Sequence, residues 1–163
     1  MYIEIKRIRQ YGEIIEGQLF IDAFSDHGKH MQYICDTLEN GLTPLPLGKY
    51  QIQVQKCHFR SRKMPLVITD PDNPAPPCKH CVKPEHVNNN SSPHKGGAKG
   101  EALFCPMITM GNGIHNRHDG SILVGQQGAR GLLLHPKTTF DLLYERIRKS
   151  ASRGNTTTLN ITE

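Results

Sequence analysis

The 163-residue sequence has no tryptophan and few other aromatic residues, with five Tyr and five Phe that make up 6% of the chain. Proteins that bind single-stranded nucleic acid without sequence preference stack the bases on aromatic side chains. The composition therefore offers little material for a stacking platform of that kind.

Long apolar runs are also missing. No apolar stretch reaches the roughly 20 residues that a membrane-spanning helix needs. The N-terminal stretch MYIEIKRIRQYGEIIEG alternates charged and apolar residues and lacks the apolar centre of a secretory signal. We therefore expect a protein that is made in the cytoplasm and has no membrane span. If it acts at the cell envelope or in a phage particle, another system must deliver it.

The charged residues leave the chain basic, with 20 Lys and Arg against 15 Asp and Glu, a formal net charge of +5 and a pI near 9.0. A basic surface attracts anionic partners, such as nucleic acid, an anionic cell-wall polymer or lipid headgroups. The basic residues are dispersed, apart from the short runs KCHFRSRK (56–63) and RIRK (146–149). Because an ordinary soluble protein also carries dispersed basic residues, we do not expect a nucleic-acid partner.

Apolar and polar residues alternate along the first third of the chain, with the period of a half-buried strand. The alternation covers the N-terminus and the stretches GQLFIDAF (17–24), MQYICDTLE (31–39) and GKYQIQVQK (48–56). Turn residues separate these stretches, as in SDHGKH and ENGLTPLPLG. The sequence therefore predicts a β-meander, in which Tyr50, Ile52 and Val54 share one face.

The composition changes between residues 70 and 104. Six of the eleven prolines and the runs NNNSS and KGGAKG fall in this segment, where apolar residues are scarce. A segment of this composition cannot bury a core of its own. We therefore expect one domain over residues 1–163 with a long irregular insertion at 70–104, after which the apolar run ALFCPMITM resumes the core.

One segment near the C-terminus has helical periodicity. Its apolar residues recur at the spacing i, i+3, i+4 and i+7, and they are Phe140, Leu143, Tyr144 and Ile147. We expect Thr138 to cap the helix, with Asp141 three residues later, and Gly154 to end the segment.

The stretch TTTLNIT follows the helix and predicts a last strand, with Leu159 and Ile161 facing inward. The sequence thus predicts a mainly β protein of the α+β class. It would be a compact antiparallel or mixed β-sheet or barrel, with one amphipathic C-terminal helix that covers a face of the sheet.

The stretch GNGIHNRHDGSILVG (111–125) combines two histidines, an aspartate and a serine with four glycines. Glycine lets backbone approach backbone or ligand closely, and histidine titrates near neutral pH. Two interpretations are therefore open. The stretch is either an active-site loop or a tight turn between two strands.

Three parts of the chain resemble an uncharacterised family of bacterial and phage domains. They are CDTLEN followed by TPLPLGKYQI, then GIHNRHDGSILVG, and then the helix. The family pattern has a TLE strand, an IPAGTY-like turn into a strand, and a motif of the type IHxGNxxxDTxGCILVG. Order and spacing match over most of the chain outside the insertion.

Such domains are more distantly similar to the L,D-transpeptidase catalytic fold. There a TPxGxF-like strand precedes a histidine and a SHGC motif, whose Cys attacks a peptidoglycan stem peptide. By motif, residues 43–50 correspond to the first element, His115 to the histidine, and Gly120 with Ser121 to the Gly-Cys pair. The resemblance implies a domain associated with peptidoglycan peptides, in which the nucleophile position has changed to Ser121.

This change alters the chemistry, because a hydroxyl, unlike a thiolate, needs a base that removes its proton in the transition state. His115 or His118 would be that base, oriented by Asp119. Backbone N–H groups of Gly120 or Ser121 would stabilise the oxyanion.

A non-catalytic interpretation stands beside this one. Ser121 would then only begin a strand, and His115 would only hold the loop by hydrogen bonds. The domain would be a pseudoenzyme, or a structural or binding module of a phage particle or a delivered effector. Fold-level analogy cannot choose between these alternatives.

The chain has five cysteines, four of which lie at the ends of or inside the polar segment. These four are Cys57, Cys78, Cys81 and Cys105. The CKHC spacing lets two thiolates reach one Zn²⁺. We expect the four thiolates to bind one structural zinc ion, which would fix a segment that has no core.

Alternatives to this zinc site are open. The cysteines could form disulfides, although the missing secretory signal argues against an oxidising compartment, or they could stay reduced, as we expect of Cys35 in its apolar strand. One Cys ligand could be replaced by a histidine, and the candidates are His58, His80, His86 and His94. A redox-active CxxC is not expected, because the motif does not begin the helix of a βαβ unit.

Overall fold

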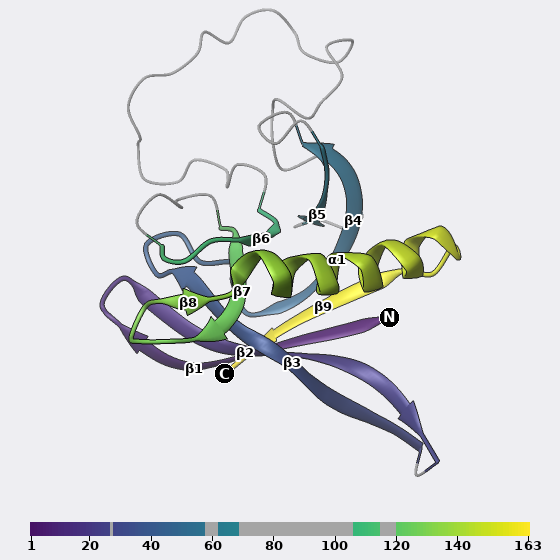
Figure 1. The fold of residues 1–163 in the computed structure, drawn as a ribbon, viewed down its shortest axis with the longest axis horizontal. Coiled ribbons are helices and arrows are strands. Elements are labelled where there is room, and N and C mark those ends of the chain that lie inside the picture. The colour runs from purple at the N-terminus through teal and green to yellow at the C-terminus, as the bar shows by residue number, and fades with distance from the viewer. Residues whose placement is uncertain (27, 58–61, 69–105, 115–119) are drawn as a thin grey trace, which may run out of the picture.

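Nine strands and one helix form the part of the chain that the computed structural model describes, which is residues 1–26, 28–57, 62–68, 106–114 and 120–163 (Figure 1). The elements are β1 (Tyr2–Tyr11), β2 (Ile14–Ser25), β3 (Gly28–Asn40), β4 (Gly48–Cys57), β5 (Arg62–Ile68), β6 (Ile108–Met110), β7 (Ile122–Gln127), β8 (Leu133–Leu134), α1 (Pro136–Ser152) and β9 (Thr157–Thr162). This confirms the predicted mainly β fold with one helix near the C-terminus. The predicted insertion at 70–104 lies outside the described residues.

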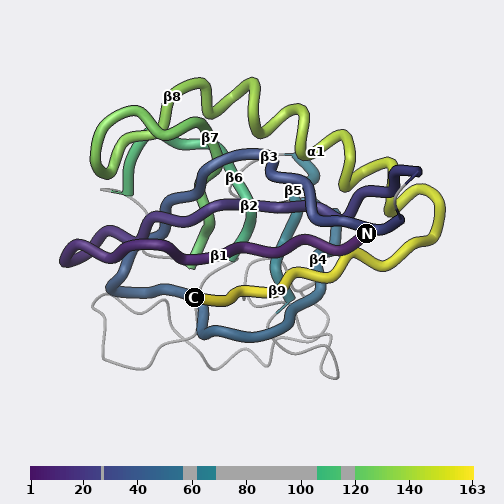
Figure 2. The backbone as a smooth tube through the Cα atoms, turned by 90° about the horizontal axis from the view of Figure 1, so that it is seen from below, coloured from purple at the N-terminus to yellow at the C-terminus, as the bar shows by residue number. Residues whose placement is uncertain are grey.

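The strands form one mixed sheet in the order β5-β4-β9-β1-β2-β3-β7-β6, with β8 paired to β7. The pairs β1–β9 and β6–β7 are parallel, and the other pairs are antiparallel. The two ends of the sheet meet, because Leu66 of β5 bridges Met107, and the Val67 N–H donates a hydrogen bond to the Pro106 carbonyl at 2.8 Å. The sheet is therefore nearly closed into a barrel (Figure 2).

The meander predicted at the N-terminus is confirmed by β1, β2 and β3. Ile3 pairs with Ile21 and Ile5 with Leu19, so that these four side chains meet in the interior of the barrel. The predicted apolar face of β4 is confirmed as well. Tyr50 and Ile52 are buried, and Val54 is partly buried and packs against the same cluster.

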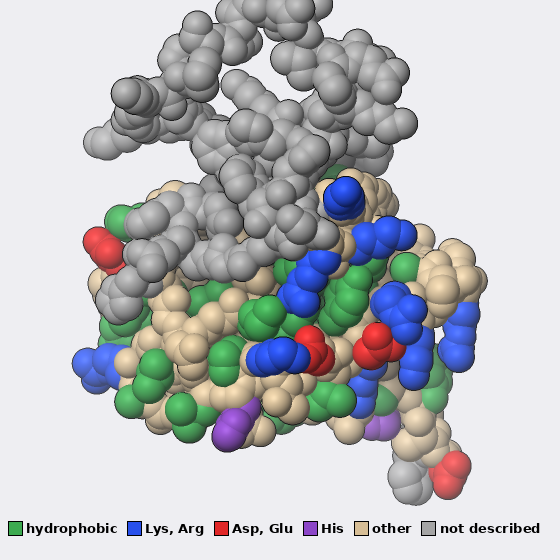
Figure 3. Space-filling model, turned by 45° about the horizontal axis from the view of Figure 1, so that its top comes forward, with side chains coloured by type: hydrophobic (Ala, Val, Ile, Leu, Met, Phe, Trp, Pro, Cys, Tyr) green, Lys and Arg blue, Asp and Glu red, His purple; other side chains and the backbone are tan. Residues whose placement is uncertain are grey.

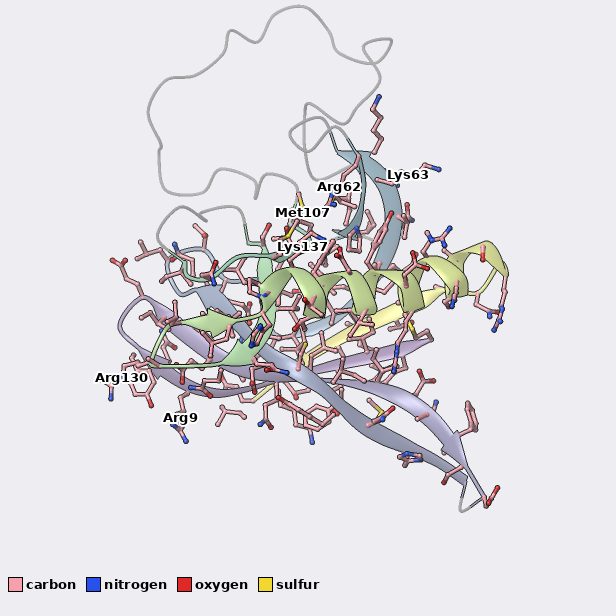
Figure 4. The ribbon with its side chains drawn as sticks, viewed as in Figure 1. Arg9, Arg62, Lys63, Met107, Arg130 and Lys137 are labelled. Carbon is pink, nitrogen blue, oxygen red and sulfur yellow. The ribbon has the colours of Figure 1, made fainter. Side chains whose placement is uncertain are left out.

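Helix α1 runs along one side of the barrel and places its apolar stripe on the core (Figures 1 and 2). Phe140, Leu143 and Ile147 are buried, as the periodicity predicts. Tyr144 is half-buried and stacks on Phe140, with 5.6 Å between the ring centroids. The Arg62 guanidinium carbon lies 5.3 Å from the centroid of the Phe140 ring, and this cation–π contact links β5 to α1 (Figure 4).

The predicted start of α1 is wrong. Thr138 does not cap the helix, which begins at Pro136 after His135, a residue with φ of 50° and no capping side-chain hydrogen bond. The physical reason is that proline already has the φ value of a first helical residue and lacks the N–H that a cap would satisfy. The predicted end is confirmed, because Gly154 has φ of 74° and donates its N–H to the Ala151 carbonyl.

The last strand, β9, lies between β1 and β4. It is parallel to β1, with Ile3 opposite Leu159 and Ile5 opposite Ile161, and antiparallel to β4, with Tyr50 opposite Leu159. Leu159 and Ile161 are buried, as predicted. Strand β9 therefore joins the N-terminal meander to the β4–β5 hairpin.

Candidate functional site

Ser121, the predicted nucleophile, directly precedes β7 and is 3% exposed. The preceding Gly120 has φ of 69°, a left-handed conformation that favours glycine. The next residue, Ile122, donates its N–H to the Met107 carbonyl at 2.9 Å and so begins the parallel pairing with β6. The Gly-Ser pair therefore makes the turn that brings the chain into the sheet.

Packing explains why glycine occupies position 125, the last glycine of the motif. A Cβ atom at this position would lie 2.8 Å from both the Leu133 Cβ and the Leu134 carbonyl oxygen. Strand β8 therefore packs directly on the backbone of β7, and only glycine leaves room for it.

Ser121 faces away from the barrel interior. The residues Ile122 and Val124 belong to the main core, so that Leu123 and Ser121 lie on the opposite face of the strand. A second group of apolar side chains covers this face, and we call it the outer cluster: Leu38, Ile114, Leu123 and Leu133. Thr109 pairs with Leu123 and is also buried, so that small hydroxyl side chains recur around the outer cluster.

Asn40 is the residue of β3 that comes closest to Ser121 in register. Leu38 of β3 is opposite Leu123 of β7 in an antiparallel pair. The same register continued by two residues would set Asn40 beside Ser121. The observed pairing ends at Leu38 and Leu123, and both Asn40 and Ser121 are buried, with 4% and 3% of their surface exposed.

The loop between Ile114 and Gly120 carries the predicted base and its orienting group. These residues, His115, His118 and Asp119, lie outside the described residues. The N-terminal end of the loop is fixed, because Ile114 belongs to the outer cluster and Asn112 exchanges two hydrogen bonds with the Leu133 backbone, at 2.8 and 2.9 Å. The loop therefore begins and ends at the outer cluster. The catalytic roles of its side chains stay predictions.

A buried ion pair anchors the TPLPLG turn. Arg7 donates Nε–H to Glu39 Oε1 at 3.0 Å and Nη2–H to Glu39 Oε2 at 2.7 Å, and its Nη2 also donates to the Leu45 carbonyl at 2.6 Å. The side chains are 11% and 2% exposed. The Tyr50 hydroxyl donates to the Pro46 carbonyl at 2.6 Å. The turn is thus held by side chains from β1, β3 and β4.

Asn40, at the end of β3, holds the start of the same turn. Its Oδ1 accepts a hydrogen bond from the Leu42 N–H at 2.9 Å, and its carbonyl accepts one from the Thr43 N–H at 3.2 Å. Asn40 therefore fixes the start of the turn. Sequence reasoning missed Asn40 and the Arg7–Glu39 pair, because the burial of these polar residues depends on which strands become neighbours.

Burial changes the acidity of two groups near this region. It raises the pKa of the Cys35 thiol to about 12, with a further contribution from the negative charge of Asp36. Burial also raises the pKa of Tyr50, partly offset by the positive charge of Arg7. Cys35 is 1% exposed and is a free thiol, as predicted. A buried thiol with a raised pKa is a poor nucleophile.

The predicted zinc site is represented in the described residues only by Cys57, the last residue of β4. The other three predicted ligands lie outside them: Cys78, Cys81 and Cys105. No group of three or more His, Cys, Asp or Glu that could hold a metal occurs within the described ranges. Zinc binding by the four cysteines stays a prediction.

The described backbone sets a condition on that prediction. Cys57 is opposite Arg62 at one end of β5, whereas Pro106, the neighbour of Cys105 in the chain, bonds Val67 near the other end. Five residues of extended strand separate Arg62 from Val67, which is about 16 Å. The described backbone at Cys57 and at Pro106 is therefore held near opposite ends of β5, and an ion shared by the four cysteines has to join these two ends.

The hollows on the described surface include two that lie away from Ser121. The larger, of about 330 Å³, lies at the β1 end with Arg7, Arg9 and Glu163 in its wall. The smaller, of about 200 Å³, lies between Ile34 and Leu142. Neither has Ser121 in its wall. Neither of these two hollows therefore gives a substrate access to Ser121.

Basic side chains gather along α1 (Figure 3). Two exposed ion pairs occur on this helix, Lys137–Asp141 at 2.6 Å and Arg148–Glu145 at 2.9 Å. Two more basic side chains contact Tyr11 at the end of β1 (labelled in Figure 4): Arg9 donates Nη1–H to the Tyr11 hydroxyl at 3.5 Å, and the Arg130 guanidinium carbon is 4.3 Å from the centroid of the Tyr11 ring. The surface therefore offers positive charge on α1 and at the β1 end.

Comparison of the chain with protein-family models, with curated proteins and with solved structures finds no match. Among the described residues, no helix has both the length and the apolar character needed to cross a membrane. The family resemblance and the activity that it implies are therefore carried by the sequence motifs alone.

Proposed function

We propose that this chain is a domain associated with peptidoglycan peptides, of the L,D-transpeptidase-like type, in which Ser121 no longer performs acyl transfer. The observation that carries the proposal is the burial of Ser121, which is 3% exposed. A nucleophile must touch the carbonyl carbon that it attacks. A side chain with this little exposed surface cannot do so in the described conformation.

The surroundings of Ser121 support a structural role. By strand alternation the side chain shares a face with Leu123 of the outer cluster, and the β3–β7 register continued by two residues would set Asn40, which holds the TPLPLG turn, beside it. A small polar residue fits such a place, because it can be buried at low cost when its hydroxyl finds a partner. Ser121 would then hold together two motifs that form the catalytic centre in the related enzymes.

The charge of the surface supports binding to a wall polymer. The chain has a net charge of +5, and basic side chains gather along α1 (Figure 3). Exposed ion pairs such as Lys137–Asp141 contribute little to stability, so that their charges can rearrange toward an anionic ligand. The proposed binding is therefore electrostatic in part and should weaken as salt screens it.

Acylation is tested by incubating the wild-type chain with a peptidoglycan stem pentapeptide and measuring the intact mass. Ser121→Ala removes the hydroxyl, and Thr109→Ala is the matched control, because Thr109 is a buried hydroxyl residue on the same face. We expect no acyl adduct in any of the three proteins. An adduct on the wild type that Ser121→Ala abolishes and Thr109→Ala retains would overturn the structural role of Ser121.

Binding is tested separately by sedimentation with purified peptidoglycan sacculi. We expect the wild type and Ser121→Ala to sediment equally, and less of each to sediment as the salt concentration rises. If neither protein sediments at low salt, the association with the cell wall is refuted, and the alternative of a structural module in a larger assembly takes its place.

A further inference from the structure

Strand β3 has a free edge over its N-terminal half. It pairs with β2 along its whole length, from Gly28 opposite Ser25 to Asn40 opposite Ile14. On its other side it pairs with β7 only over residues 36–38. In the described part of the chain, no strand pairs with this side of β3 before residue 36. The N-terminal half of β3 and the end of β2 project from the barrel as a two-stranded ribbon (Figure 1).

The projecting ribbon exposes large apolar side chains. Phe24 is 79% exposed and Tyr33 is 46% exposed, and Tyr33 packs edge-on against Phe20 with 5.8 Å between the ring centroids. A two-stranded ribbon alone is only marginally stable in water, and three or more strands are needed for independent stability. The ribbon therefore lacks both a third strand and a cover for its aromatic residues.

The side chains of the edge alternate between two faces. In the β2–β3 register, Phe20 is opposite Tyr33, Asp22 is opposite Met31 and Phe24 is opposite Lys29. Because the interior residue Ile21 alternates with these β2 residues, one outward face of β3 carries Lys29, Met31 and Tyr33. His30 and Gln32 lie on the other face. The pairing of β2 with β3 is regular up to Phe20 and Tyr33, where a bulge between Leu19 and Phe20 shifts the register. The regular part of the free edge is therefore residues 28–33.

We propose that this edge pairs with the same edge of a second copy of the chain, antiparallel and centred on Met31. Residues that are opposite each other in an antiparallel pair point to the same face of the sheet, whereas neighbours along one strand point to opposite faces. A two-fold axis between two identical strands must therefore place one residue opposite its own copy, because an axis between two residues would pair residues of opposite faces. Centring on Met31 sets Lys29 of one copy opposite Tyr33 of the other. It also sets His30 opposite Gln32.

The edge is chemically complementary to itself in this register. A lysine opposite a tyrosine gives a cation–π contact on each side of the axis, and the two methionines meet at the centre. Within one copy, Lys29 Nζ lies 3.4 Å from Asp22 Oδ2 and 6.0 Å from the centroid of the Tyr2 ring, so that the contact with Tyr33 requires this exposed side chain to turn toward the free edge. Centring on His30 instead would set two histidines opposite each other and leave Tyr33 without a partner. The Met31 register is therefore the one that the side chains favour.

The dimer would also satisfy the backbone. Two ribbons joined edge to edge form a four-stranded sheet, which supplies the missing strands and covers the unpaired N–H and C=O groups of both copies. This inference does not depend on the proposed function.

The test is the mass of the full chain in solution, measured by light scattering over a range of concentrations. We expect a dimer for the wild type. Met31→Lys puts two like charges at the axis, and we expect its dissociation constant to rise at least tenfold. Leu142→Lys is the matched control, because it makes the same kind of change at a side chain on α1 that is 66% exposed, and we expect it to stay dimeric.

The register is tested by cross-linking under mild oxidation, with the wild type as the background for the native cysteines. Met31→Cys should form a disulfide-linked dimer, because residues at the axis are opposite each other. Lys29→Cys should not, because the two copies of this position lie roughly 13 Å apart along the strands. The proposal is refuted if the chain is a monomer at all concentrations, including one that pairs only with an added extended peptide. It is also refuted if Met31→Lys leaves a dimer intact, or if Lys29→Cys forms the cross-link.

Discussion

The two halves of β3 belong to one continuous strand but have opposite environments. In residues 35–40 every residue except Asp36 is buried, because β2 and β7 lie on the two sides and the main core and the outer cluster cover the two faces. In residues 28–33 only Met31 is more than slightly covered, and β2 is the single neighbour. The neighbours of a strand, and not its own β propensity, therefore decide how much each of its residues contributes to stability.

The largest effect that this comparison predicts is at Glu39. Glu39→Ala leaves the Arg7 guanidinium buried without its carboxylate, and we expect a loss of about 3–5 kcal/mol in the free energy of unfolding. Replacing both residues by apolar ones, Arg7→Met with Glu39→Leu, should cost less, because no charge then stays buried. Urea denaturation measures both.

Lys6→Ala is the control for this prediction, because Lys6 is 52% exposed and lies 3.8 Å from Glu4 in an exposed pair. Its effect should be below about 1 kcal/mol. Equal losses for Glu39→Ala and Lys6→Ala would contradict the role of the buried pair as an anchor of this half of β3.

A smaller difference is expected between apolar residues of the two halves. Leu38 is 1% exposed in the outer cluster, and Leu38→Ala should lower the free energy of unfolding by about 3 kcal/mol. Met31→Ala, on the projecting half, should cost less than about 1 kcal/mol when measured at concentrations where the chain is monomeric. Comparable losses at the two positions would remove the distinction between the halves.

The last effect depends on pH, is absent at neutral pH, and arises at Cys35, where the buried half begins. Its pKa in the folded protein, about 12, is above the value of 9.0 expected for an exposed thiol. The unfolded chain therefore releases this proton at lower pH, so that the stability is complete below pH 9 and is lost as the pH rises from 9 toward 12. The slope should be at most about 1.4 kcal/mol per pH unit.

Cys35→Ala should make the loss of stability per pH unit smaller. A part of the loss stays in this variant, because the ionisation of the buried tyrosine also depends on pH in this range. Thermal unfolding at pH 8, 9, 10 and 11 measures the effect. A slope of the same size in wild type and Cys35→Ala would show that the thiol does not contribute. The comparison uses slopes because the substitution itself also changes the packing.

The sequence was a good guide where a local period decides the structure. The strands of the meander, the apolar stripe of α1 and the inward residues Leu159 and Ile161 follow from periods of 2 and 3.6 residues. The start of the helix did not follow, because Pro136 prevails over the capping signal of Thr138. Closure of the sheet did not follow either, because the β5–β6 contact and the parallel β1–β9 pair join segments far apart in the chain.

The candidate site was predictable only in part. The motif located Gly120 and Ser121, and the structure adds the left-handed φ of the first and the burial of the second. Asn40 and the Arg7–Glu39 pair depend on which strands become neighbours, which a local pattern does not contain. Burial of a polar group can be recognised only once its partners are known.

The position of β9 has a consequence for synthesis on the ribosome. Strands β1 and β4, which flank β9, are both made before the last strand leaves the ribosome. Until then both present unpaired edges, and such edges promote aggregation. The barrel cannot close as its first strands emerge, and folding must wait for the pairing of segments that lie at opposite ends of the described chain. A nascent chain halted before Thr157 should therefore need a chaperone to stay soluble, even though most of its core residues are already present.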